Sequence, residues 1–223
     1  VEELLKFSDA EIQVDLYERL PAPYGLVRYG VAPDHLKIKN VTAIYDKIAE
    51  HPRFRYYGNV ELGKHLSLQQ LQDYYHGVIL TTGASDDRKL AIAGEDLSES
   101  YPATAFVGWY NGHPDYRDLQ FDLNAKRAVV IGVGNVAIDV ARILVSTPEE
   151  LRQSDIAEHA LEALSHSKIE EVVIVGRRGP AQAAFTNPEL KELDELQDAD
   201  FWAMAEEVNL DVHSAAALQA EPD

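Results

Sequence analysis

Two glycines and the helix that follows them are the residues of this 223-residue chain best suited to bind a ligand. Gly132 and Gly134 lie between the apolar run 128–131 and a stretch with helical spacing from Asn135. Glycines at such a turn let the backbone approach a pyrophosphate, and the helix start offers it N–H groups and the positive end of the dipole. The pattern predicts a dinucleotide site. Ala137 lies at the position where the glycine-rich dinucleotide-binding motif has Gly or Ala.

A pair of arginines predicts which dinucleotide is bound. The apolar run 172–175 leads through Gly176 to Arg177 and Arg178. In a site for NAD the equivalent strand ends in an acid that binds the ribose 2′-hydroxyl, whereas two arginines would pair with a 2′-phosphate. The pattern therefore favours NADP(H) over NAD(H). The alternative for the glycine turn alone is an ordinary strand–turn–helix of a flavodoxin-like protein.

The stretch between these two runs is long, and an inserted pair of helices explains its length. Thr147 followed by Pro148 and two acids is typical of a helix start. An apolar stripe with helical spacing follows and is interpreted as core: Ile156, Ala160, Leu161 and Leu164.

Composition excludes several other classes of function. The chain has no cysteine, so disulfides, iron–sulfur ligation and thiol catalysis are excluded, and redox chemistry would need an organic cofactor. Its formal net charge of −18 argues against nucleic-acid binding. Much of the charge is concentrated in 189–211, which is interpreted as a solubilising helix face or a mobile segment. The eight histidines show no paired metal-ligand spacing, so no metal site is predicted, and no apolar run is long enough for a membrane span.

The first half of the chain has the pattern of another nucleotide-binding fold. A strand predicted over 12–17 ends at Glu18, where a ribose-binding acid belongs, although a surface acid is an equal alternative. The segment 21–35 is rich in proline and glycine but apolar, which favours a structured loop on a large flat ligand. His35 at its end is interpreted either as a proton donor or positioning group or as a hydrogen-bonded structural histidine.

Alternating strands and helices predict a doubly wound α/β fold. Helices are expected over 37–51 and 66–75, a strand pair over 54–57 and 59–62, and a buried strand over 77–84. The polar stretch 86–104 is the predicted boundary or linker, and 106–112 is an aromatic connector or a packed hinge.

Six motifs together resemble the adrenodoxin reductase-type ferredoxin–NADP(+) reductases, most closely their bacterial members, from about residue 11 to about 196. They are Tyr17-Glu-Arg-Leu-Pro, Tyr24-Gly-Leu-Val-Arg, Gly30-Val-Ala-Pro-Asp-His, Phe106-Val-Gly-Trp-Tyr-Asn-Gly, Gly134-Asn-Val-Ala-Ile-Asp-Val-Ala-Arg and Val175-Gly-Arg-Arg-Gly-Pro. The resemblance implies two Rossmann-like, three-layer domains: a partial FAD-binding domain over 1–85 and an NADP-binding domain over 105–223. It also implies that hydride passes from NADPH to FAD and single electrons pass to a ferredoxin-type iron–sulfur protein, in a bacterial cytoplasm or, for a eukaryotic member, the mitochondrial matrix.

The resemblance assigns roles by position. Glu18 would bind the FAD ribose, Leu26 and Leu62 would line the flavin nucleotide, and Glu189 would lie beside the NADP adenosine ribose. His35 and Glu192 match positions near the nicotinamide and flavin, with Asp139 as a further candidate. The remaining positions would hold the NADP pyrophosphate and 2′-phosphate: Val133, Gly134, Asn135, Val136, Arg177 and Arg178.

The family pattern is incomplete in this sequence. The N-terminal glycine turn for FAD and the later part that completes the FAD domain are not found, so the chain is expected to be a piece that does not hold FAD tightly by itself. Two alternatives follow: an NADP-binding module without catalysis, or the flavin reductase subunit of a larger enzyme such as a glutamate synthase small subunit. Docking of an acidic ferredoxin would need a local basic patch, for which Lys191 is a candidate. Further candidates, with simple solvation as the alternative, are Arg28, Lys37, Lys39, Arg53 and Arg55.

Overall fold

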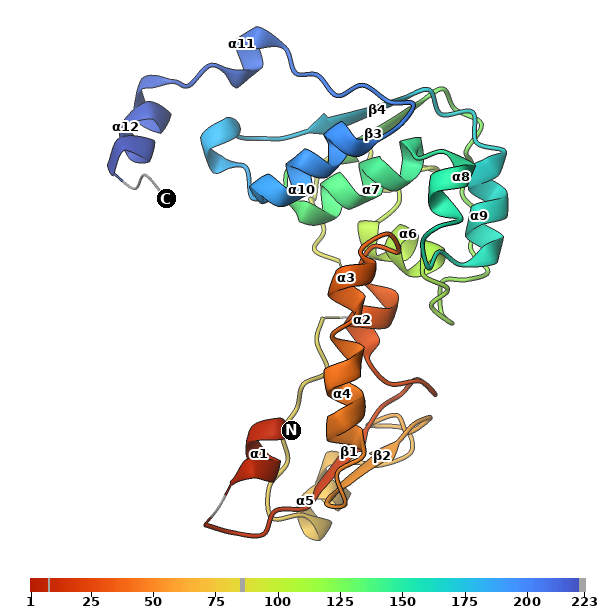
Figure 1. Cartoon of the computed structure of the whole chain (residues 1–223), viewed down its shortest axis with the longest axis vertical. Coiled ribbons are helices and arrows are strands. Elements are labelled where there is room, and N and C mark those ends of the chain that lie inside the picture. The colour runs from red at the N-terminus through yellow and green to blue at the C-terminus, as the bar shows by residue number, and fades with distance from the viewer. Residues whose placement is uncertain (8, 85–86, 221–223) are drawn as a thin grey trace. The chain divides into compact units, whose positions relative to one another are not determined.

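The computed structural model describes residues 1–7, 9–84 and 87–220, which form two compact units. Unit 1 comprises Val1–Val31 and His35–Asp87, and unit 2 comprises Ala32–Asp34 and Arg88–Asp223 (Figure 1). The short piece Ala32–Asp34 therefore belongs to the second unit although both of its flanking segments belong to the first. Among the helices of the described residues, none has the length and apolar character that a membrane span requires.

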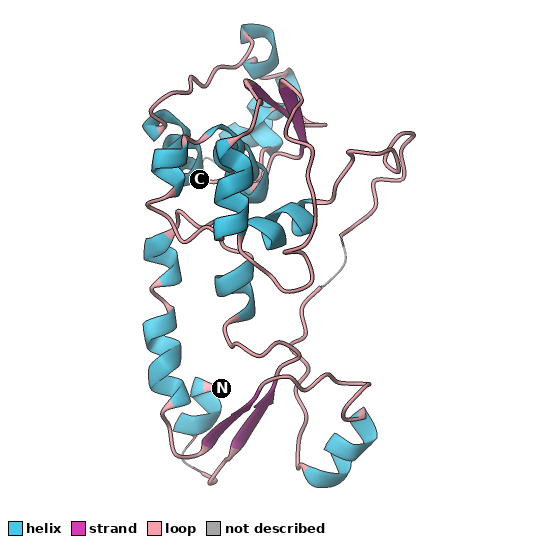
Figure 2. Cartoon of the chain, turned by 90° about the vertical axis from the view of Figure 1, so that its right-hand side faces the viewer, coloured by secondary structure: helices cyan, strands magenta, loops and turns pink. Residues whose placement is uncertain are grey.

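Unit 1 contains a small parallel sheet with helices around it. Its two strands pair in register from Val14 with Phe54 to Tyr17 with Tyr57, and Figure 2 shows them in magenta. Parallel strands need a crossover connection, which the helices between them supply. The elements in order are α1 (Glu2–Lys6), β1 (Val14–Tyr17), α2 (Gly25–Tyr29), α3 (Leu36–Lys39), α4 (Thr42–Ala49), β2 (Phe54–Tyr57) and α5 (Leu68–Tyr74).

Aromatic and ionic contacts fix these two strands. The rings of Tyr17 and Tyr57 stack with centroids 5.0 Å apart, and the hydroxyls of Tyr17 and Tyr75 lie 2.6 Å apart. Arg55 donates two hydrogen bonds to the Asp15 carboxylate, at 2.7 and 2.8 Å, across the strand pair. A bidentate pair of this kind restrains both side chains, so the end of β1, and with it the following residue, has a defined direction.

Four expectations for this half are corrected. The segment 59–62 is not a strand, because the backbone turns at Asn59, whose φ is +59°. The segment 77–84 is also not a strand: β1 and β2 pair with each other in the described residues, and Ile79 and Leu80 are 70% and 57% exposed. The predicted helix over 37–51 is two helices, α3 and α4, and the loop predicted over 21–35 contains α2.

Unit 2 contains a second parallel pair, which confirms the strands expected on either side of the glycine turn. The two strands, β3 and β4, pair from Arg127 with Glu171 to Ile131 with Val175. Figure 1 shows α7 running along this pair. The elements are α6 (Ala103–Tyr110), β3 (Arg127–Ile131), α7 (Asn135–Val145), α8 (Pro148–Leu151), α9 (Glu158–Ser165), β4 (Glu171–Val175), η1 (Pro180–Gln182), α10 (Asn187–Lys191), η2 (Glu192–Glu195), α11 (Ala205–Val208) and α12 (Val212–Ala220). Both units are thus small parallel sheets with helices, and the predicted α/β class is confirmed at this level.

The core of unit 2 lies among helices rather than inside the sheet. Phe106, Trp109 and Tyr110 of α6 are buried against α7 and α9, and Tyr110 and Ile143 are fully buried. Most of the segment 106–112, expected to be an aromatic connector or a packed hinge, lies in α6, and all residues of 105–110 are buried. The inserted helices are confirmed: Thr147 and Glu150 form a capping box at α8, and Ala160 and Leu164 are buried.

Gly108 in α6 gives a test of this packing. A Cβ at Gly108 would lie 2.3 Å from Cδ2 of Tyr116, so Gly108→Ala should destabilise unit 2 by about 1–3 kcal/mol through overpacking. Chemical denaturation followed by tryptophan fluorescence measures the change. The control is Gly179→Ala, where the nearest atom, Oε1 of Gln182, would be at an ordinary 3.6 Å and the cost should be small. Equal stability of the two variants would contradict the tight approach of Tyr116 to α6.

Candidate dinucleotide site

The turn between β3 and α7 has the backbone that a phosphate cradle needs. Gly132 adopts φ +145°, a conformation that a side chain would strain, and its built Cβ would lie 3.8 Å from Cβ of Ala137. Gly134 has φ −115° and ψ 176° as the residue before α7, a conformation that any residue adopts. A Cβ built on Gly134 meets no atom within 4 Å. The space outside Gly134 is therefore open, which fits close approach of a ligand rather than internal packing.

The N-terminus of α7 faces this open space. Its first turn begins at Asn135 and Val136, and Ala137 N donates to Gly134 O at 2.9 Å as the helix closes. The first amides of an α-helix have no intrahelical acceptor, and the helix dipole adds partial positive charge at this end. Helix α7 has 11 residues, so its free amides and its dipole together favour an anion at this turn.

A second loop packs on the same turn. Ala184 N donates to Val133 O at 2.7 Å, and a Cβ on Gly176 would lie 2.6 Å from Cγ1 of Val133. Glycine at 176 is thus required for the end of β4 to approach the turn. Arg177 and Arg178 follow directly, are exposed, and enter none of the ion pairs found in the described part of the chain. They remain available for a ligand anion.

Asn135 performs a structural task that its sequence position did not predict. Its Oδ1 accepts a hydrogen bond from Thr186 N at 2.8 Å, and its Nδ2 donates to Oε1 of Glu189 at 3.5 Å. The first residue of α7 therefore holds the segment that leads into α10. Glu189, predicted to lie on the ribose side of the nucleotide, is brought next to the glycine turn by this contact.

Arg142 is a buried charged residue beside this site that the sequence analysis did not single out. Its side chain is 4% exposed and is surrounded by three carboxylates of unit 2. Nε and Nη2 donate to the two oxygens of Asp34 at 2.6 and 3.0 Å, and Nη2 donates to Asp139 at 2.8 Å. Nη1 lies 3.0 Å from Oε2 of Glu192. Only the i, i+3 spacing to Asp139 was a sequence signal, because Asp34 is remote in the chain.

The charge state of this cluster follows from its contacts. Burial by itself lowers the pKa of Arg142, but hydrogen bonding to Asp34 and the charges of Asp34, Asp139 and Glu192 outweigh it and raise the pKa above its ordinary value. The guanidinium is therefore a permanent cation. Asp139 and Glu192, two residues predicted to take part in chemistry, share it.

The other predicted residues lie in unit 1. Oε1 of Glu18, directly after β1, accepts a hydrogen bond from Leu20 N at 2.9 Å. Leu26 on α2 is 78% exposed and Leu62 is 40% exposed, so neither belongs to the core. His35 precedes α3, and its carbonyl accepts from Lys39 N at 3.1 Å. Asp139, Glu189 and Glu192 thus belong to unit 2, and Glu18, Leu26, Leu62 and His35 belong to unit 1.

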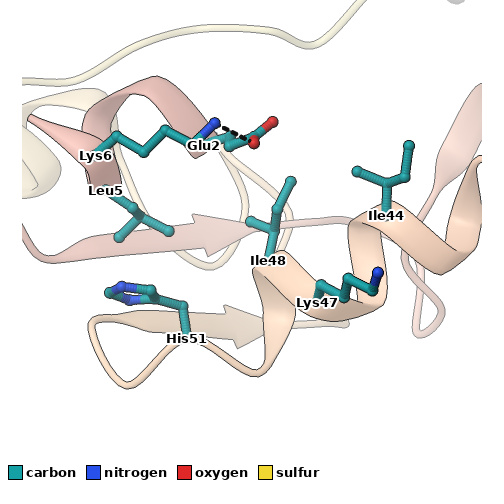
Figure 3. Close-up of a pocket in the computed structure, with 7 residues that line it drawn as sticks. All are labelled: Glu2, Leu5, Lys6, Ile44, Lys47, Ile48 and His51. Atoms are coloured by element: carbon teal, nitrogen blue, oxygen red, sulfur yellow. Dashed lines mark hydrogen bonds and ion pairs between the residues drawn. The ribbon is translucent and has the colours of Figure 1, made fainter.

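A cavity of unit 1 does not coincide with these residues. It lies between α1 and α4, with Leu5, Ile44 and Ile48 as its apolar lining and Lys6 and Lys47 among its polar residues (Figure 3). In Figure 3 the only bond drawn between lining residues joins Lys6 to Glu2, one turn apart on α1. No residue predicted to bind FAD lines this cavity.

Part of the predicted basic docking patch is used inside unit 1. Arg53 donates to the backbone carbonyls of Ile12 and Leu5, and Arg55 is bound to Asp15. Lys39 is 8% exposed. Arg53 and Arg55 are thus bonded within unit 1 and Lys39 is buried, which makes these three residues poor candidates for contacting a partner.

Gly134 gives the sharpest test of the turn. Because its backbone suits any residue and its Cβ direction is open, Gly134→Ala should change the free energy of unfolding by less than about 1 kcal/mol. The added methyl group would occupy the space where a pyrophosphate approaches, so NADP(+) affinity should fall by at least about tenfold, measured by calorimetry. Gly77→Ala adds a methyl group in open space of unit 1 and is the control. Unchanged affinity in Gly134→Ala would show that the turn holds no phosphate.

Comparison with known proteins agrees with the motifs. No family model matches the chain. The NADPH-ferredoxin reductase FprA of Mycobacterium tuberculosis is 55% identical over 193 residues, which cover 86% of this chain and 42% of that protein. The mitochondrial NADPH:adrenodoxin oxidoreductase of Drosophila melanogaster is 52% identical over 187 residues, covering 84% of this chain and 40% of that protein. The chain therefore spans less than half the length of these curated relatives.

Solved structures extend the agreement to the backbone. The structure of M. tuberculosis FprA in complex with NADPH is 54% identical and superposes with a TM-score of 0.87 over 89% of this chain and 45% of that chain. Another structure of the same protein, described for a covalent modification of NADP(+), gives a TM-score of 0.86 at 53% identity over 89% of this chain and 44% of that chain. Identity of this level together with a shared backbone confirms the resemblance found in the motifs. Over the matched residues, the chain is homologous to the NADPH-ferredoxin reductase and NADPH:adrenodoxin oxidoreductase proteins.

Proposed function

We propose that this chain contributes to an FAD-dependent oxidoreductase that takes hydride from NADPH and passes single electrons to a ferredoxin-type iron–sulfur protein. The observation that carries the proposal is the open Gly134 cradle at the start of α7, with the exposed Arg177 and Arg178 on the adjoining loop. Relatives that are 55% and 52% identical are named NADPH-ferredoxin reductase and NADPH:adrenodoxin oxidoreductase, which supports the reaction.

The proposed organisation is two Rossmann-like domains, with a partial FAD-binding domain over 1–85, a linker over 86–104 and an NADP-binding domain over 105–223. The parallel pair β3–β4, the crossover through α7 and the glycine turn support the second domain. The parallel pair β1–β2, with an acid directly after β1, supports the first.

In the proposed NADP site the turn Gly132–Val136 receives the pyrophosphate at the N-terminus of α7. Arg177 and Arg178 hold the 2′-phosphate by paired charge-assisted hydrogen bonds. Glu189, held by Asn135, contacts the adenosine ribose. The residues present fit this ligand because backbone, helix dipole and cations all favour an anion at the same loop pair.

The residues of unit 1 fit FAD in part. Glu18 keeps a carboxylate at the end of β1 for a ribose hydroxyl, and Leu26 and Leu62 offer exposed apolar side chains for a flat ligand. Bound FAD would accept two electrons as hydride and release them singly. His35, Glu192 and Asp139 are proposed to hold protons and orient groups near the reacting rings. The Arg142 cluster keeps the two carboxylates in fixed positions.

Calorimetric titration with NADP(+) and NAD(+) tests whether the Gly134 turn and the two arginines bind the nucleotide. The chain should prefer NADP(+), and Arg177→Ala/Arg178→Ala should weaken NADP(+) binding by at least about 100-fold, because each lost charged hydrogen bond contributes about 1.5–3 kcal/mol. NAD(+) binding should change little.

The control for this titration is Lys126→Ala/Arg127→Ala, which removes the same charge from exposed positions at the start of β3. This double variant should bind NADP(+) nearly as well as the parent chain. If both double variants lose affinity equally, the effect is net charge, and no 2′-phosphate site exists at 177–178.

A further inference from the structure

Two residues on one face of α7 hold the neighbouring segment 186–192 in place. Asn135, Asp139 and Arg142 follow the spacing that places residues on one side of a helix. Asn135 is hydrogen-bonded to Thr186 N and to Glu189, and Arg142 forms an ion pair with Glu192. Figure 1 shows α10 lying along α7, consistent with these contacts. The segment Thr186–Glu192 is thus fixed along two turns of the helix.

The contact with Glu192 brings a third carboxylate to a guanidinium that already has two. Arg142 is already compensated by the bidentate bond to Asp34 and by Asp139, and a third carboxylate adds negative charge to a buried cluster. Buried ion pairs are weak sources of stability because desolvation offsets the attraction. Glu192 is also the most exposed of the three, with 35% of its side chain accessible. The contact therefore restrains a partly accessible acid rather than completing a core.

We propose that Arg142 is a positioning residue of the nucleotide site: through Glu192, and together with Asn135, it fixes residues 186–192 as a wall beside the Gly132–Gly134 turn. Ala184, just before this segment, is bonded to Val133 of the turn, so displacement of the segment changes the site directly. A shift of about 1 Å in a positioned group is enough to cost large factors in function. The inference rests on the proposed NADP(H) site.

Glu192→Gln is the main variant, because it removes the charge that Arg142 holds and leaves the bonds of Arg142 to Asp34 and Asp139 in place. Glu195→Gln, an exposed acid of the same turn η2, is the matched control. Amide hydrogen exchange in residues 188–196 should rise about tenfold in Glu192→Gln and stay unchanged in Glu195→Gln. The thermal midpoints of the two variants should agree within about 2 °C.

NADP(+) affinity gives a readout that a merely structural contact would not move. Glu192→Gln should raise the NADP(+) dissociation constant by about three- to tenfold, and Glu195→Gln should not. Arg142→Lys, which keeps the charge but loses the planar fork, should weaken binding similarly. Arg142→Lys/Glu192→Gln should bind no more weakly than the worse single variant, because Glu192 acts through Arg142.

The outcomes separate this inference from the proposed function. If the parent chain binds NADP(+) and Glu192→Gln matches Glu195→Gln in exchange and affinity, Arg142 does not position the wall, and the inference fails alone. Additive losses in the double variant would overturn it as well. If the folded parent chain binds no NADP(+), the proposed site fails and the positioning role fails with it. The exchange data then still show whether Arg142 holds the segment.

Discussion

The compensation of one buried cation fixes three segments of unit 2 that are separated in the sequence. Arg142 cannot lose its charge inside a protein, so its burial at 4% exposure requires carboxylates at hydrogen-bond distance. Asp34, Asp139 and Glu192 come from three separate places in the chain, and each has to reach the same guanidinium. Helix α7, the start of η2 and a short N-terminal piece are therefore fixed relative to one another within this unit.

The glycine turn depends on that arrangement. The helix that carries Arg142 begins at the turn, so fixing one end of α7 orients the amides at the other. The approach of the β4 loop to Val133 is tight enough that Gly176 has no room for a side chain. By contrast, Gly134 has space that the protein itself does not fill. These two glycines thus have different roles. Gly176 permits close packing between two segments, and Gly134 leaves a surface open.

Local patterns predicted the elements that depend on local interactions. The apolar runs beside the glycine turn are strands in register, Thr147 caps α8, and the stripe over α9 is core, because periodicity and capping act within a few residues. The segment 77–84 has a strand composition but no neighbour in the described residues to bond with, and strand formation requires one. Pairing between distant residues, as between Arg142 and Asp34, leaves no periodic trace. The sequence therefore indicated Asp139 and Glu192 without indicating the cation that holds them.

The assignment of Ala32–Asp34 to unit 2 has a practical meaning for dissecting the protein. Ala32 and Pro33 are buried, Pro33 O accepts from Asp155 N at 3.1 Å, and Asp34 supplies the bidentate partner of Arg142. Expression of residues 88–220 by themselves would remove all three and leave a buried arginine short of its strongest ligand. No single cut of the chain therefore yields a complete unit 2. A version of unit 2 expressed by itself would need residues 32–34 restored, either by circular permutation or as an added peptide.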